Sequence, residues 1–362
     1  MMKRMVSAAR VAMAVGVLLS LAGGATAQEP KDPGNPEEIR ALLTAADQAA
    51  TGTPANSLAI KWEQQHFIKS FADKTYVPFT VSVDAAAFTA PTPVGLYLRV
   101  AKRGELPPTT AAVAAKDSDK KKKDKKDEQK GTQVDARHQY PFEDVFFFDI
   151  PAGVAGKPTL LRRAFAVAPG DYDVYVGIKE KGVAAASGPS PKIGVIKHEL
   201  TVPSLGTEFT TSSVILAEKV DVLQQEIPSD RQSENPYTFG AMKLTPSMDA
   251  KFVKADDLNV IFWIYGAGVD ATTKKPNVEV EYNFHQKTAD GEKFFNKTDP
   301  QVMNAQTLPP QFDLAAGHQL PGSLSVPLAS FPEGQYRLEV KLTDKTSGKT
   351  VTRESIFSVA AQ

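Results

Sequence analysis

The feature that constrains this chain most is a repeated strand pattern. The segment GDYDVYVGIKE, residues 170–180, is echoed 164 residues later by GQYRLEVKLTD, residues 334–344. In each copy apolar residues occupy alternate positions, the period that places them on one face of a β-strand. These residues are Tyr172, Val174, Val176 and Ile178 in the first copy and Tyr336, Leu338, Val340 and Leu342 in the second. A repeat whose apolar positions align in this way predicts two domains with the same kind of β-fold.

Alternation of apolar and polar residues continues elsewhere in the chain, for example over 77–83 and 278–284. The segment 144–150 is apolar at consecutive positions, which predicts a central strand buried on both faces. The 26 prolines and 24 glycines suit short strands joined by turns. We therefore predict an all-β protein with two tandem immunoglobulin-like or fibronectin-like β-sandwich domains, over 58–204 and 205–362.

A tyrosine follows a glycine at the start of each echoed strand. Tyr172 and Tyr336 are therefore candidate tyrosine corners, in which the phenol hydroxyl bonds nearby backbone between two sheets. The alternative is an ordinary late strand that follows a turn. Both interpretations predict the same fold.

The N-terminus has the pattern of a secretory signal peptide. Basic residues precede an apolar run over 11–21, which is followed by an A-x-A motif that ends at Ala27. A membrane-spanning helix needs about 20 apolar residues, so cleavage after Ala27 is favoured over anchoring. We expect residues 1–27 to be removed. The mature chain is then exported to the periplasm or the medium, with no transmembrane segment.

Charge and cysteine content narrow the function classes. The formal net charge is zero, so the overall field does not attract nucleic acid. The chain has no cysteine, so no disulfide can support the exported fold. Hydrophobic burial must therefore hold it together.

Residues 28–57 are predicted to form a leader with one short helix. Asn35 is a capping residue, and Pro36 occupies the first helical position, before two glutamates that suit the helix dipole. Apolar residues then recur at helical spacing and predict a helix over 36–49. The pattern leaves open whether this helix packs on a domain or belongs to a mobile leader.

A charged stretch interrupts the first predicted domain. Residues 116–130 hold eight lysines and five acidic residues, with no apolar residue. Such a segment cannot bury enough surface to offset its ordering entropy, so we predict a disordered loop over 105–135, inserted between two strands. The interleaved acids favour a solvated spacer over a basic brush that touches anionic lipids or polymers.

The sequence contains no arrangement typical of a catalytic, metal or cofactor site. Its five histidines are far apart, and it has no G-x-S-x-G, P-loop or G-x-G-x-x-G motif. Asp171 and Asp173 are interpreted as the outward side of a strand rather than a calcium site. We predict a protein that is not an enzyme, with no catalytic residue, no metal and no cofactor. A hydrolase that uses scattered acidic residues is a further alternative to the binding functions described below.

Two aromatic clusters are candidates for ligand binding. Trp62 lies near the start of the first domain, and Trp263 and Tyr265 share one face of a strand in the second. Exposed rings on a sheet face can stack sugars, so these three are the candidate ligand-stacking residues of a polysaccharide-binding module. Rings of this kind more often serve as core or interdomain contacts.

Several segments resemble a group of exported bacterial proteins. They are YVPFT, GDYDVYVGIKE, TSSVILA and the closing PLASFPEGQYRLEVKLTDKTSGK. The pattern is similar to exported β-sandwich proteins of Acidobacteria and related bacteria, whose β-sandwich regions accompany von Willebrand-type A or GWxTD-type domains. The chain has neither the G-W-x-T-D sequence nor the D-x-S-x-S metal site of an A domain, so no functional residue carries over. The resemblance implies an envelope location in a diderm bacterium.

Together these observations predict an exported cell-envelope protein that acts as a structural or protein-interaction module. Envelope proteins are the expected partners, and nucleic acid is not. The alternative is a polysaccharide-binding module that uses Trp62 and Trp263.

Overall fold

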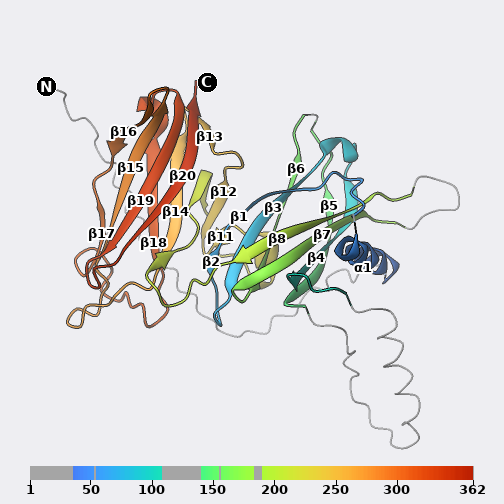
Figure 1. Ribbon diagram of the computed structural model, residues 1–362, viewed down its shortest axis with the longest axis horizontal. Coiled ribbons are helices and arrows are strands. Elements are labelled where there is room, and N and C mark those ends of the chain that lie inside the picture. The colour runs from blue at the N-terminus through green and yellow to red at the C-terminus, as the bar shows by residue number, and fades with distance from the viewer. Residues whose placement is uncertain (1–35, 53, 108–139, 155, 183–189, 362) are drawn as a thin grey trace, which may run out of the picture.

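The computed structural model describes residues 36–361 except 53, 108–139, 155 and 183–189 (Figure 1). The described chain is mostly β-strand, with one α-helix, α1 (Pro36–Thr51), and short 3₁₀ turns. None of the described helices is long and apolar enough to cross a bilayer. The predicted signal peptide, residues 1–27, and most of the predicted lysine-rich loop, residues 108–135, lie outside the described residues.

The first sandwich is built from two sheets of four strands each. Its strands are β1 (Lys61–Gln65), β2 (Ile68–Lys69), β3 (Thr75–Val83), β4 (Thr92–Lys102), β5 (Phe142–Ile150), β6 (Thr159–Val167), β7 (Gly170–Glu180) and β8 (Ile193–Val202). One sheet has the order β5-β4-β7-β8, and in the other β3 pairs with β1, β2 and β6. The lysine-rich segment connects β4 to β5, which pair with each other directly.

The second sandwich has two sheets of six strands each. One has the order β11-β12-β10-β14-β18, with β9 on β14, and the other has the order β13-β20-β19-β15-β16, with β17 on β15. The strands are β9 (Thr210–Thr211), β10 (Ile215–Val222), β11 (Thr238–Phe239), β12 (Met242–Pro246), β13 (Lys251–Val253), β14 (Asp257–Tyr265), β15 (Val278–Thr288), β16 (Gly291–Lys297), β17 (Gln301–Met303), β18 (Leu320–Pro327), β19 (Gly334–Asp344) and β20 (Thr350–Ala360).

The two echoed strands occupy equivalent positions in their sheets, and this explains the sequence echo. In the first, β7 lies between β4 and β8; in the second, β19 lies between β15 and β20. No sheet of the described chain draws strands from both halves. Gly170 and Gly334 open the two echoed strands with φ of 153° and 144°, a backbone conformation that favours glycine. The predicted all-β tandem sandwich is therefore the fold of this chain.

Each echoed strand buries its alternate residues in its own core. Tyr172, Val174, Val176 and Ile178 belong to the core of the first sandwich, and Tyr336, Leu338, Val340 and Leu342 to that of the second. The hydroxyl of Tyr172 donates to the carbonyl of Ala168 at 2.8 Å, and that of Tyr336 donates to Pro332 at 2.6 Å. Both contacts reach backbone four residues upstream, as a tyrosine corner does.

The matched corners allow a paired prediction. Replacing Tyr336 with phenylalanine removes the bond to Pro332 and keeps the buried ring, so the free energy of unfolding should fall by about 1 kcal/mol. Tyr172→Phe should show a loss of similar size, since its hydroxyl makes the same contact in the first sandwich. Urea denaturation of both variants measures this. Losses below about 0.3 kcal/mol in both would show that the hydroxyl bonds contribute nothing net.

The helix is part of the first sandwich. It lies against the outer face of the β5-β4-β7-β8 sheet (Figure 1). Leu42, Ala46 and Ala49 pack with Tyr97, Ala101, Tyr175 and Val195 of that sheet in one buried cluster. The alternative of a mobile leader is therefore wrong for residues 36–51, because the helix covers apolar side chains of three strands.

Burial of this sheet on both faces corrects the interpretation of Asp173. That carboxylate was expected to face solvent, yet it is buried. It accepts a hydrogen bond from the Gly104 amide at 3.0 Å and pairs with the Lys197 ammonium at 2.9 Å. Asp171 is exposed, as expected, and lies 3.3 Å from Arg103.

The prediction of a central strand over 144–150 was wrong. Strand β5 pairs only with β4 and is an edge strand. Its two apolar faces have separate causes. On the inner face, the Arg163 guanidinium lies over two phenylalanine rings. Its Cζ atom is 5.1 Å from the ring centroid of Phe146 and 4.3 Å from that of Phe148. On the outer face, Val145 packs against the cluster that includes the helix. A covering helix thus produced the pattern expected of a central position.

Candidate functional site

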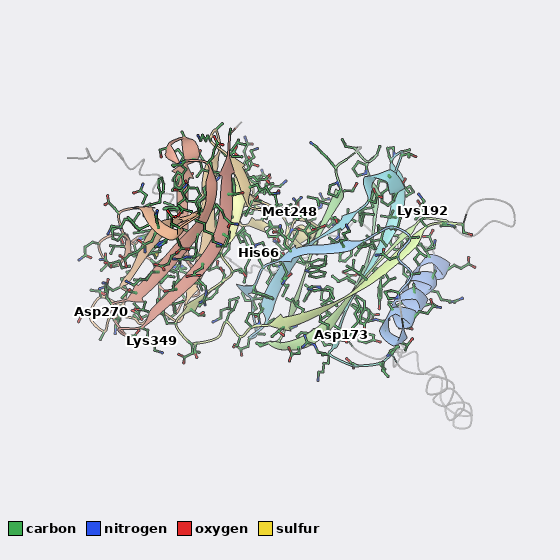
Figure 2. The ribbon with its side chains drawn as sticks, turned by 45° about the horizontal axis from the view of Figure 1, so that its top comes forward. His66, Asp173, Lys192, Met248, Asp270 and Lys349 are labelled. Atoms are coloured by element: carbon green, nitrogen blue, oxygen red, sulfur yellow. The ribbon has the colours of Figure 1, made fainter. Side chains whose placement is uncertain are left out.

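The candidate functional site is the junction between the two sandwiches. Figure 2 shows His66 and Met248 where the two domains meet. Segment 66–69 of the first sandwich lies against strands β10 and β14 of the second through hydrogen bonds and a shared apolar cluster. The junction therefore combines residues from both halves of the chain.

An apolar cluster forms the centre of the junction. The first sandwich contributes Ile68, which is buried, and Tyr76, which is partly buried. The second contributes the outer face of its β10-β12-β14 sheet and one loop residue. These side chains are Ile215, Ala217, Tyr237, Leu244, Ile261 and Trp263. Strand β14 is consequently apolar on both faces, with one face in its own core and the other against the first sandwich.

One backbone–backbone bond and two bonds from backbone amides to hydroxyls join the two domains. The Ser213 amide donates to the Phe67 carbonyl at 2.9 Å, and the Phe67 amide donates to the Ser213 hydroxyl at 2.8 Å. The Lys69 amide donates to the Tyr265 hydroxyl at 3.0 Å. These bonds fix the register between the segments, because backbone donors and acceptors have defined directions.

Two phenols and an imidazole extend the junction toward the loop that carries Tyr237. The Tyr76 hydroxyl donates to the carbonyl of Pro236 at 3.0 Å. The Nδ1 atom of His66 lies 2.9 Å from the Tyr237 hydroxyl, and the two rings meet edge to face. Burial lowers the pKa of His66 from 6.5 to about 4, because the apolar surroundings disfavour the charged imidazolium. The junction therefore holds a neutral histidine at pH 7.

The structure places the predicted ligand-stacking residues in packing contacts. Both faces of the Trp62 ring are covered, by Phe79 at 4.5 Å and by His198 at 4.2 Å between ring centroids. Trp263 is only 3% exposed and lies in the junction, where Tyr265 is a partner of Lys69. A sugar needs an open ring face, so the prediction that the two tryptophans form a stacking platform was wrong. They serve the core and the domain junction instead.

Sequence reasoning missed the residues that build the junction from the first domain. Ile68 belongs to a strand of two residues, too short to show a period. His66 was weighed as a metal ligand and, with Trp62 and Phe67, as part of an aromatic cluster for ligand binding, but not as a junction residue. Trp263 and Tyr265 carried the one available signal, since two aromatic residues on the outward face of a strand indicate that something covers that face.

Comparisons with known proteins concern the fold alone. No family model matches the chain, and no curated protein matches it. An immunoglobulin-like protein from Pseudomonas aeruginosa is similar in structure, with 11% identity and a TM-score of 0.20, over 41% of this chain and 97% of that one.

Two bacterial alpha-2-macroglobulins are also similar. The Escherichia coli protein activated by porcine elastase has 11% identity and a TM-score of 0.21, over 83% of this chain and 35% of that one. The Salmonella protein reacted with methylamine has 11% identity and a TM-score of 0.18, over 83% of this chain and 16% of that one. The chain therefore spans about a third or less of these two proteins.

Proposed function

We propose that this chain is a non-enzymatic, exported component of the cell envelope that holds partner proteins at a fixed geometry. The tandem β-sandwich is the architecture on which the proposal rests, and the domain junction is the observation that carries it. Two domains that share an apolar cluster and hydrogen bonds to backbone groups act as one rigid unit.

A rigid junction matters for an interaction module because it sets the distance and angle between two binding surfaces. Two linked surfaces raise each other's effective concentration only where geometry permits both to engage together. If the two domains bound their partners independently, a flexible linker would serve them equally well. The buried junction would then add little to partner binding. The role of the chain should therefore depend on the junction as well as on the surfaces.

The test compares the full-length protein with a variant that uncouples the domains. Ile68→Asp places a carboxylate in the apolar cluster and should separate the sandwiches while leaving both cores intact. Wild-type protein produced in a diderm bacterium should be recovered from the periplasm or medium, with Gln28 at its N-terminus. Mild crosslinking should attach it to defined envelope proteins, and Ile68→Asp should reduce that yield at least about tenfold.

Phe71→Asp is the matched control. It makes the same chemical change three residues away, at a side chain that is 62% exposed and outside the junction cluster. Its crosslinking yield should equal that of the wild type. Retention of the chain in the cytoplasm, or recovery of the exported protein without any envelope partner, would contradict the proposal. Equal yields for Ile68→Asp and wild type would contradict the need for a fixed geometry.

A further inference from the structure

Arg353 occupies an unusual place in the second sandwich. It lies on β20 opposite Val340 of β19, and paired residues of neighbouring antiparallel strands point to the same face. Val340 is buried in the core, as are Leu338 and Tyr336, which lie opposite Ser355 and Phe357. Arg353 and Ser355 are therefore polar residues on the core side of the sheet, and both are partly exposed.

The Arg353 guanidinium donates its hydrogen bonds to neutral oxygens. Nε donates to the Thr211 hydroxyl at 3.0 Å, Nη2 donates to the Thr210 hydroxyl at 2.8 Å, and Nη1 donates to the Thr352 carbonyl at 3.1 Å. A guanidinium has five N–H donors, so two remain beyond these three bonds. Among the described residues, no carboxylate lies within 4.0 Å of it, and burial lowers its pKa. Its positive charge is thus partly desolvated without a counter-charge.

The guanidinium borders a recess at the domain junction. The recess has a volume of about 380 Å³ and is lined by Phe67, the 203–205 connection, residues 210–214 and residues 353–355. Hydroxyl groups are frequent along its wall, on Ser204, Thr210, Thr211, Ser212, Ser213 and Ser355. Glu354 also lines it, but its carboxylate is bound to Arg337 at 2.7 Å, on the opposite face of the sheet. The charge that faces the recess is therefore that of Arg353.

The hydroxyl groups divide into those already engaged and those able to donate. Thr211 donates to the carbonyl of Ser212, and Ser212 donates to that of Ser213. Thr210 and Ser213 use their hydroxyl oxygens as acceptors, for Arg353 and for the Phe67 amide, which leaves the proton of each able to donate. A cation flanked by such a donor is the arrangement that binds an oxyanion.

We infer that this recess binds a small oxyanion, a carboxylate or phosphate group, through the Arg353 guanidinium and the Thr210 hydroxyl. The planar fork of an arginine matches two oxygens of either group. A bound oxyanion would supply the missing counter-charge. Because the recess is walled by both sandwiches and their connection, binding would also stabilise the junction by mass action.

The test titrates full-length mature protein with sodium phosphate and, separately, with sodium acetate. Sodium chloride at equal ionic strength serves as the blank, because it separates binding from screening. Amide chemical shifts of Thr210, Thr211 and Ser355 report the site. A saturable shift of these amides is expected, with a matching rise in melting temperature. Saturation by phosphate alone or by acetate alone would identify which group the recess takes.

Three variants locate the binding. Arg353→Met keeps an unbranched side chain on the core face and should weaken binding at least about tenfold, and Thr210→Val should weaken it about threefold. Arg103→Met is the control, because Arg103 has the carboxylates of Asp171 and Glu199 as partners and should bind no oxyanion. If Arg353→Met fails to fold, Thr210→Val still tests the site. Shifts that do not saturate, or affinities equal in wild type and both recess variants, would overturn the inference.

Discussion

Trp263→Ala is expected to lower the free energy of unfolding by about 3–5 kcal/mol, the usual loss when a buried tryptophan is truncated in a packed interior. The ring is 3% exposed and packs against Phe239, with 4.6 Å between ring centroids, and against the cluster that holds Ile68. Truncation leaves a cavity that both domains border, so the loss should include the coupling between them. Urea denaturation measures the total.

The same variant should change the shape of the unfolding transition. Trp62 then becomes the only tryptophan, and its fluorescence reports the first sandwich alone. Far-ultraviolet circular dichroism reports both sandwiches. The two probes should coincide in the wild type and separate in Trp263→Ala, because the domains no longer unfold together. Scanning calorimetry should show the same change as one transition becoming two.

Phe294→Ala is the control for this experiment. It also removes an aromatic ring from a strand of the second sandwich, but that ring is 59% exposed. Its effect should stay within about 0.5 kcal/mol. A loss below about 1 kcal/mol for Trp263→Ala, or probes that still coincide, would show that the junction does not couple the domains.

The sequence predicted the architecture because the alternation of apolar and polar residues is local to each strand, and each copy of the echo shows it within one strand. Tyr172 and Tyr336 could be assigned to corners since glycine, tyrosine and the alternating face occur within one strand. Each sandwich also buries its own alternate face, so a local pattern carried the information.

The errors arose where a second element covers a sheet from outside. Asp173 and β5 were assigned from the strand pattern alone. Gly104 and Lys197 contact the Asp173 carboxylate, and the cluster that includes a helix far away in sequence packs against Val145 of β5. The junction was out of reach for the same reason. Trp263 shows an apolar outward face, but no feature of the sequence identifies Ile68 as the residue that packs against it. Whether the outward face of a sheet is exposed or covered depends on tertiary contacts. A single sequence does not reveal those contacts.

The pH dependence of stability should carry a signature of His66. Its pKa is about 4 in the folded protein and 6.5 in the unfolded chain. Between these values the unfolded chain binds a proton that the folded protein does not, so the free energy of unfolding falls as the pH falls through this window. From pH 7 to pH 5 this histidine should account for a loss of about 2 kcal/mol.

His66→Gln isolates that contribution. Glutamine does not titrate, and its amide can still bond the Tyr237 hydroxyl, which lies 2.9 Å from His66 Nδ1. Burial raises the pKa of Tyr237, so this phenol stays neutral throughout the window. Other groups titrate equally in both proteins, so the difference between their stabilities at each pH reports His66. It should grow by about 2 kcal/mol in favour of the variant between pH 7 and pH 5.

His318→Gln serves as the control. This histidine is half-buried and accepts a hydrogen bond from the Asp313 amide at 3.0 Å within one loop, away from the junction. Its replacement removes an imidazole outside the junction cluster, so the stability of His318→Gln at each pH is the reference for His66→Gln. If His66→Gln loses as much stability between pH 7 and pH 5 as the wild type does, His66 is not buried as a neutral group. The junction would then be open to solvent in solution, and the fixed geometry proposed for the two sandwiches would lose its support.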